Sequence, residues 1–300
     1  VNRNTIDAVK ELGKQLHIKG KKIGFAGSKD KHAVTEQLIS VIGRKKEQVL
    51  GCNIVGIEME EFGEGNEPIT LGDLKGNYFE IVVRNLSKVD VKKIDYCENY
   101  FDEQRFSTHN AKIGKLLIQK KFKEAVLLVD SEKVQNHLKL KKNDAIGALR
   151  LLPDRLLRMY VNAYQSFLWN ETVGRYLMEH DVIKEVEYSL GKLIFIKTPV
   201  LDLQIPLIGF GNEKVKDERL HGIIEEVLNE EKIRRSDFII KQIPAISLEG
   251  EMRNVFVRIT DLEIHPEEND ELHEGTKKRK VNFSLSKGSY ATMVIKKIFG

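Results

Sequence analysis

The chain has 300 residues, of which 41% are hydrophobic and 31% are charged, a composition typical of folded, soluble proteins rather than disordered ones. Its two cysteines exclude a disulfide framework, no Cys/His spacing is typical of a zinc site, and a cytoplasmic location is therefore favoured. No run approaches the roughly 18 apolar residues that a membrane span needs, so we expect no membrane partner.

The net charge of +4 conceals a segmental pattern. Three segments are basic and two are acidic, with net charges of +6 for 1–50, −6 for 51–80, +7 for 111–160, −10 for 161–276 and +7 for 277–300. If folding gathers the basic segments on one face, they favour nucleic-acid binding. The alternative is that they are solvated, lysine-rich helix faces. We expect a basic cleft where the three segments meet, with the acidic residues turned away.

The first third of the chain alternates between helix and strand signals. Apolar spacing predicts an amphipathic helix over 4–17, capped by Asn4 or Thr5. The short apolar run 22–27 predicts a buried strand that enters a turn. The other elements expected here are a helix or strand over 33–42, strands over 52–59 and 77–84 with a loop between these two, and a helix over 88–99.

The middle of the chain is helical and the end returns to strands. From about residue 109 to 182 the apolar residues recur with a period of about 3.6, and Pro153 marks a boundary. The expected elements are helices near 109–118, 121–130, 142–149, 160–179 and 216–230, short strands within 190–212 and 246–265, a polar connection or hairpin loop over 265–280, a strand over 281–287 and a helix over 290–299. This order predicts an α+β or α/β domain that is interrupted by an inserted, mainly helical domain.

The segment GFAGSKDKHAVTEQ, residues 24–37, is the most informative one for chemistry. It places Asp30 on a tight turn among Lys29, Lys31 and His32, and such cations favour an ionised carboxylate. An oriented carboxylate suits a nucleophile or a stabiliser of positive charge at a sugar carbon, and the three cationic side chains could also meet phosphates. The alternative is that Asp30 only caps the following helix or turn.

Five segments, in order along the chain, resemble motifs of the TruD-type pseudouridine synthases. The run G-S-K-D-K-H-A-V-T-E-Q resembles that family's G-x-K-D-K/R-x-A-V-T-x-Q. The other four are G-N-Y-F-E-I with Arg84 (76–84), Y-F-D-E-Q-R-F (100–106), N-A-Y-Q-S-F-L-W-N (162–170) and F-S-L through G-S-Y-A-T (283–292). Asp102 and Ser107 stand where glycines are usual in the family.

The resemblance implies a fold and a reaction. The catalytic domain, a mixed and largely antiparallel sheet flanked by helices, would span 1–106 and 246–300, and the family's inserted domain would span 107–245. Family members begin with a strand that carries a basic residue, and because nothing here matches it, we expect that strand upstream of Val1. The family converts uridine to pseudouridine in tRNA, usually at uridine 13, without a cofactor or metal. RNA is thus the expected partner.

The resemblance also assigns residues. Asp30 would be catalytic, through nucleophilic attack on the uridine or assistance in glycosidic cleavage. Phe79 would stack on the target base, with core packing as its alternative, since Tyr78 and Phe79 point to opposite faces of a strand. Asn77 would support the catalytic loop. Further residues expected to bind RNA are Lys29, Lys31, His32, Arg105, Ser289 and Thr292; Arg105 could instead pair with a buried acid.

Two other functions compete with this one. The first is a noncatalytic RNA-binding protein, a tRNA-folding factor on the same scaffold, which the lack of a match to the amino-terminal strand favours. The second is a nuclease that uses Asp30 with a metal ion, which is disfavoured because the motif holds no second acid to share the ion. The helix around 162–170 is expected to be structural, with its apolar face in the core.

Overall fold

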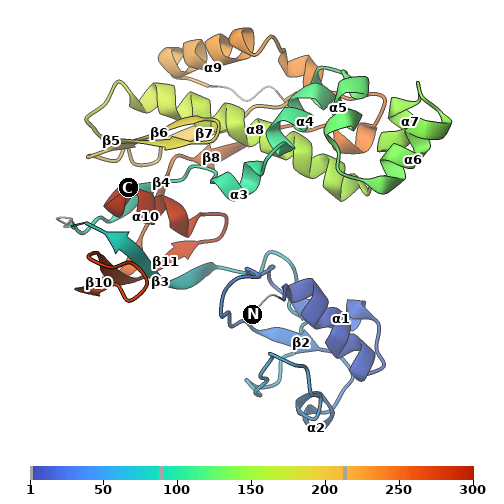
Figure 1. The fold of residues 1–300 in the computed structure, drawn as a ribbon, viewed down its shortest axis with the longest axis vertical. Coiled ribbons are helices and arrows are strands. Elements are labelled where there is room, and N and C mark those ends of the chain that lie inside the picture. The colour runs from blue at the N-terminus through green and yellow to red at the C-terminus, as the bar shows by residue number, and fades with distance from the viewer. Residues whose placement is uncertain (1–2, 88–90, 212–214) are drawn as a thin grey trace. The chain divides into compact units, whose positions relative to one another are not determined.

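The computed structural model describes residues 3–87, 91–211 and 215–300, and the chain divides into two compact units, Val1–Asn77 and Tyr78–Gly300. The elements of each are labelled in Figure 1. Helices and antiparallel strand pairs occur in both units, so the predicted α+β class is confirmed.

The first unit is built on one helix and a short strand pair. Helix α1 (Thr5–Gln15) begins where predicted, with the Asp7 N–H donating to the Asn4 side chain at 2.8 Å. Strands β1 (Ile23–Phe25) and β2 (Ile39–Val41) pair antiparallel, and α2 (Lys46–Leu50) follows β2. The buried side chains of this small core are Val9, Leu12, Leu16, Ile23 and Ile54.

The strand predicted over 52–59 is wrong. These residues form turns that are closed by a single antiparallel bridge between Ile54 and Ile57. Gly56 lies between them with a φ of 76°, a left-handed conformation that reverses the chain. The apolar Ile54 is therefore buried in the small core by a turn and not by a strand, while the loop predicted before 77–84 is confirmed over 60–68.

The second unit is organised around one long helix. Helix α8 (Asp154–Leu177) begins directly after the boundary at Pro153, six residues before the predicted start near 160, and it packs against α4, α9, β6 and β7 (Figure 1). The other helices are α3 (Glu103–Phe106), α4 (Asn110–Ile118), α5 (Phe122–Leu128), α6 (Glu132–Leu140), α7 (Ala145–Leu149), α9 (Glu218–Glu230) and α10 (Ala291–Phe299). Apart from the short α3 and from α6, each had been predicted within a few residues.

The strands of the described chain form small sheets. The largest has the order β10-β11-β3, from β10 (Thr260–Asn269), β11 (Lys277–Ser286) and β3 (Gly76–Leu86). The antiparallel pairs are β4 (Tyr96–Glu98) with β9 (Phe256–Arg258), β5 (Val182–Tyr188) with β6 (Gly191–Ile196), and β7 (Gln204–Leu207) with β8 (Glu251–Asn254). The polar connection predicted over 265–280 is shorter than expected, because β10 and β11 extend into it.

The helix predicted over 88–99 is also wrong. Residues 88–90 lie outside the described residues, and residues 96–98 form β4, which pairs with β9. The partner strand comes from the far end of the chain, so local periodicity could not indicate it. The pairing buries Glu98, whose carboxylate accepts a hydrogen bond from the Ile196 N–H at 2.9 Å.

Acidic side chains lie beside the basic residues of the last basic segment, 277–300. Lys278 lies 2.6 Å from Glu271, and Arg279 lies 3.2 Å from Glu267. Antiparallel pairing places Glu267 on β10 opposite Arg279 on β11, and Glu271 lies in the turn between the two strands. The expectation that acidic residues turn away from the basic blocks is therefore wrong for 277–300, much of whose charge is neutralised within the fold.

The helices α4 to α9 all fall within 107–245, together with β5, β6 and β7. One core contains side chains from this range and from both of its flanks, such as Phe106, Trp169 and Phe283. The boundaries of the predicted insertion stay a prediction. None of the helices in the described ranges has both the length and the hydropathy needed to cross a bilayer.

Candidate active site

The loop that carries Asp30 is fastened to the first residue of α1. After β1 the chain runs without regular structure to β2. The Lys29 N–H donates to Thr5 Oγ1 at 2.9 Å, and Gln37 Nε2 donates to the same oxygen at 2.9 Å. Thr5 is buried. One buried hydroxyl thus fixes the loop on both sides of Asp30.

A second anchor reaches the loop from β3. Lys29 Nζ donates to Asn77 Oδ1 at 2.6 Å. Asn77 is the second residue of β3, and it was expected to support this loop. The structure brings the two residues together, and it directs the Lys29 ammonium to an amide oxygen.

Asp30 itself is exposed, as are Lys31 and His32. Within residues 3–87, 91–211 and 215–300, no hydrogen bond or ion pair engages the Asp30 carboxylate. Because no backbone N–H in these ranges donates to it, Asp30 does not act as a helix or turn cap there. Its carboxylate is free to meet a ligand.

Phe79 belongs to the second unit and lies on β3. Its ring is 5.6 Å from that of Phe283, centroid to centroid, with the ring planes inclined at 35°. Phe79 is half-buried, whereas Tyr78 is 56% exposed, so the expected division between the two strand faces is confirmed. One part of the Phe79 side chain thus packs against the core, and the other part is accessible to solvent.

Arg105 lies on α3 beside an aromatic ring. Its Nε donates to Ser166 Oγ at 3.3 Å, and its guanidinium carbon is 5.7 Å from the centre of the Phe101 ring. In the part of the chain that the structure describes, no carboxylate lies within ion-pair distance of Arg105. The alternative in which Arg105 pairs with a buried acid is therefore not observed there.

The closing motif joins the start of α10 to the start of α3. Thr292 Oγ1 and Lys296 Nζ each donate to the carboxylate of Asp102 at 2.8 Å. Asp102 stands where the family has a glycine, and these contacts give its side chain a structural role. Ser289 is half-buried and follows Gly288, which has a left-handed φ of 82°.

Arg253 on β8 was missed by the sequence reasoning. Its Nη2 donates to the backbone oxygen of Asn99 at 2.8 Å and to that of Gly288 at 3.1 Å, and its guanidinium carbon lies 4.2 Å from the centre of the Phe101 ring. Burial lowers the pKa of Arg253 to about 10. The residue lies outside all five motifs, and its contacts come from distant parts of the sequence, so no local signal marked it.

The motif helix around 162–170 is structural, as expected. Trp169 Nε1 donates to the Ile205 oxygen at 3.0 Å, and Gln165 Nε2 donates to the Ile208 oxygen at 3.0 Å. Asn170 both accepts from the Phe101 N–H and donates to the Phe101 oxygen. These buried polar groups satisfy backbone groups of neighbouring segments.

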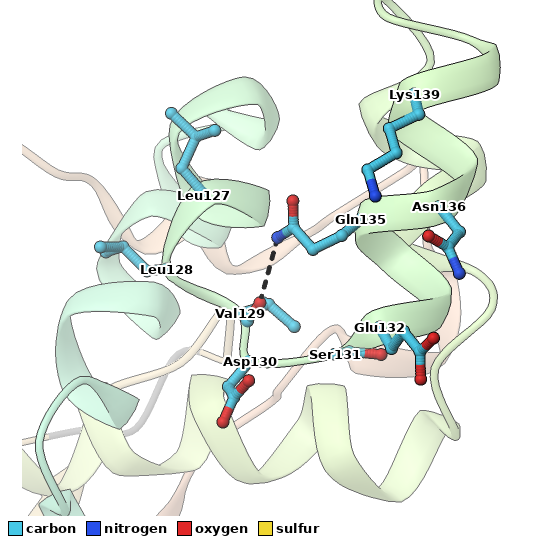
Figure 2. Close-up of a pocket in the computed structure, with 9 residues that line it drawn as sticks. All are labelled: Leu127, Leu128, Val129, Asp130, Ser131, Glu132, Gln135, Asn136 and Lys139. Atoms are coloured by element: carbon cyan, nitrogen blue, oxygen red, sulfur yellow. Dashed lines mark hydrogen bonds between the residues drawn. The ribbon is translucent and has the colours of Figure 1, made fainter.

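A pocket of about 510 Å³ lies between α5 and α6. Figure 2 shows its lining, in which Gln135 Nε2 donates to the Val129 oxygen at 3.5 Å. None of the residues predicted for the site lines this pocket, so we do not place the site there. Across the described ranges, no group of three or more His, Cys, Asp and Glu residues is placed to hold a metal ion.

The fold defined by these elements is found in a solved structure. A crystal structure described as that of a tRNA pseudouridine synthase D (TruD) candidate from Methanosarcina mazei matches 99% of this chain and 85% of that chain, with a TM-score of 0.72 and 24% identity. It therefore shares the overall fold.

The family follows from sequence comparison. The model of the family described as "tRNA pseudouridine synthase D (TruD)" matches residues 1–136 and 130–298. A relative from Methanocaldococcus jannaschii, named "Probable tRNA pseudouridine synthase D 2", is 32% identical over 99% of this chain and 83% of its own length. The "tRNA pseudouridine synthase D" of Aquifex aeolicus is 30% identical over 98% of this chain and 88% of its own length. The chain belongs to the TruD family, a family of isomerases, and the resemblance predicted from its motifs is confirmed.

Proposed function

We propose that this chain converts uridine to pseudouridine in tRNA, at uridine 13, and that the Asp30 carboxylate is the nucleophile. In this proposal the carboxylate attacks C1′ of the ribose as the bond from N1 to C1′ breaks. It leaves again as carbon 5 of the turned uracil bonds to C1′. Carbon 5 gives up a proton and N1 takes one up, so the product is an isomer and the reaction balances without a cofactor.

One observation carries the proposal. Asp30 is an exposed carboxylate with no partner in the described chain, on a loop whose neighbouring residue Lys29 is fixed by Thr5 and by Asn77. Catalysis requires a reacting group that is free and a backbone that is held, because positioning supplies much of the rate. The family membership of the chain supplies the substrate class, and the usual family target supports uridine 13.

The other residues that the motifs single out, in both units, have proposed roles in holding RNA. Phe79 stacks on the target base; turning a base out of its stack costs a few kcal/mol, and one aromatic contact returns roughly 1–3 kcal/mol. Lys29 positions the loop through Asn77. The residues proposed to contact the RNA itself are Lys31, His32, Arg105, Ser289 and Thr292.

The experiment uses a tRNA transcript whose uridines carry tritium at carbon 5, because each conversion releases that tritium to water. Wild-type protein is expected to release it from a transcript with uridine at position 13 and not from one with cytidine there. Asp30→Asn is expected to release none while still binding the tRNA. Glu36→Gln removes another exposed carboxylate of the same loop and is expected to match the wild type.

Each outcome decides between the functions. Tritium release by Asp30→Asn at the wild-type rate overturns the catalytic assignment. Binding without release by the wild-type protein overturns the enzyme and favours the RNA-binding alternative. Release from the transcript with cytidine at position 13 overturns the proposed target only.

A further inference from the structure

Two arginines from distant parts of the second unit meet at one aromatic ring. The guanidinium carbons of Arg105 and Arg253 lie 5.7 and 4.2 Å from the centre of the Phe101 ring. Arg253 also lies 5.2 Å from the ring centre of Trp169. No carboxylate of the described residues forms an ion pair with either guanidinium. Neither guanidinium therefore has an ion-pair partner there, although the charge of Glu251 acts on Arg253 from outside ion-pair distance.

Most donors of this pair are unused. Arg253 makes all of its hydrogen bonds through Nη2, and its buried Nε has no partner. Arg105 bonds only through Nε, to Ser166. For the described chain, Nη1 of Arg253 and both Nη atoms of Arg105 are left without an acceptor. Hydrogen-bond donors that are fixed in place but unpaired are typical of an anion-binding site.

The electrostatics agree with this geometry. Burial lowers the pKa of Arg253, and the charge of Arg105 acts in the same direction. Both side chains still carry a charge at neutral pH. The two aromatic rings and the carbonyl oxygens of Asn99 and Gly288 stabilise these charges only in part. An anion that accepts hydrogen bonds from both guanidinium groups would add to this compensation.

We propose that Arg105 and Arg253 together bind a phosphate group of the RNA backbone. The planar guanidinium fork matches the oxygens of a phosphate and forms strong, charge-assisted hydrogen bonds with them. The proposal rests on the proposed function, whose substrate carries one phosphate per nucleotide, and adds Arg253 to the binding surface. Because Arg253 also holds the Gly288 oxygen, phosphate binding occurs next to the G-S-Y-A-T segment.

The test is the salt dependence of tRNA binding. Equilibrium binding of a tRNA transcript is measured at several KCl concentrations for the wild type, Arg253→Gln and Arg105→Gln. Loss of one phosphate contact reduces the slope of log K against log salt by about 0.7 to 1. Each variant is expected to show such a reduction.

A matched control separates this site from general charge. Arg279→Gln removes the same charge from an arginine that pairs with Glu267, and it is expected to keep the wild-type slope. Wild-type slopes for both Arg253→Gln and Arg105→Gln would overturn the proposal. If Arg253→Gln does not fold, as thermal unfolding will show, the slope of Arg105→Gln alone decides. The catalytic proposal is tested separately, because Asp30→Asn is expected to keep the full slope.

Discussion

The ammonium of Lys29 donates to the side-chain oxygen of Asn77 at 2.6 Å. This contact fastens the loop of Asp30 to the beginning of β3, and it explains why a lysine directly before the proposed nucleophile need not pair with it. A catalytic carboxylate gains from such an arrangement, because its backbone is held while its oxygens stay available.

The first prediction concerns this anchor. Asn77→Ala removes the acceptor of Lys29 Nζ, so the loop loses one of its two fixed points. A misplaced reacting group costs up to about a hundredfold in rate, and we expect pseudouridine formation to slow by about tenfold to a hundredfold while tRNA binding changes little. Asn66→Ala, at an exposed position of the same unit, serves as the control. An unchanged rate for Asn77→Ala would show that the anchor has no catalytic consequence.

The second prediction concerns the buried hydroxyl of Thr5. Thr5→Val keeps the shape of the side chain but leaves the Lys29 N–H and Gln37 Nε2 without their acceptor. Leaving donors unsatisfied costs about 1–3 kcal/mol of unfolding free energy. Thr5→Ser retains the oxygen and is expected to lose much less. Urea denaturation compares the three proteins, and equal stability of the Val and Ser variants would contradict this role.

The third prediction concerns the buried ion pair between β4 and α10. Lys297 Nζ lies 2.9 Å from the Glu98 carboxylate, and the side chains are 4% and 0% exposed. Lys297→Met leaves a buried carboxylate without its cation and is expected to cost about 3–5 kcal/mol. Adding Glu98→Gln removes that charge and is expected to restore part of the loss. Additive losses in the double variant would be inconsistent with a coupled pair.

The same pair predicts a pH dependence. Burial raises the pKa of Glu98, and Lys297 opposes this rise. An acid with a raised pKa in the folded state favours folding most at low pH, and this contribution is lost as the pH rises through that pKa. The stability deficit of Lys297→Met relative to the wild type is therefore expected to be larger at pH 8 than at pH 5.

The fourth prediction concerns acid unfolding. Asp270, in the loop between β10 and β11, is buried, which by itself would raise its pKa. Hydrogen bonds from the backbone of Asn85 and Leu272, and from His273 and Arg84, hold it well below the ordinary value. Arg84 and Lys278 lower the pKa of the neighbouring Glu271 to about 2.

The lowered pKa values of Asp270 and Glu271 both stabilise the folded protein at neutral pH. A carboxylate with a lowered pKa in the folded state contributes stability above its unfolded pKa of about 4, and this is lost as the pH falls towards the folded value. Between pH 5 and pH 2 the unfolding free energy of Asp270→Asn should therefore fall less than that of the wild type. Asp261→Asn changes an exposed acid at the other end of β10 and should follow the wild type. Parallel profiles for Asp270→Asn and the wild type would refute the assignment.

Local patterns predicted most of the helices and pointed to the loop that is proposed to be catalytic. The periodic, strongly apolar helices such as α8 were found because their burial repeats along the sequence. Helix α6 was not, because Val134 is its one buried residue. Strand β4 was taken for a helix because its partner, β9, lies far along the chain.

In the candidate site too, the residues that lie in motifs could be predicted, whereas those that act through long-range contacts could not. Asp30 and Lys29 lie in one motif, so the sequence could place them together, and Asn77 lies in a second motif that supported the loop assignment. The Thr5 hydroxyl and the Arg253 guanidinium act through contacts that only folding creates. Residue identity alone does not distinguish Arg253 from the surface arginines, since its character comes from the ring of Phe101 and from burial.

The most direct test of the central claim is a single-turnover measurement with Asp30→Asn. With the protein in excess over the tRNA, every transcript is bound, so the rate reports chemistry rather than affinity. We predict a pseudouridine formation rate at least about a thousandfold below that of the wild type, with unchanged tRNA binding and unfolding free energy. A rate within a few-fold of the wild-type value would contradict the assignment of Asp30 as the nucleophile.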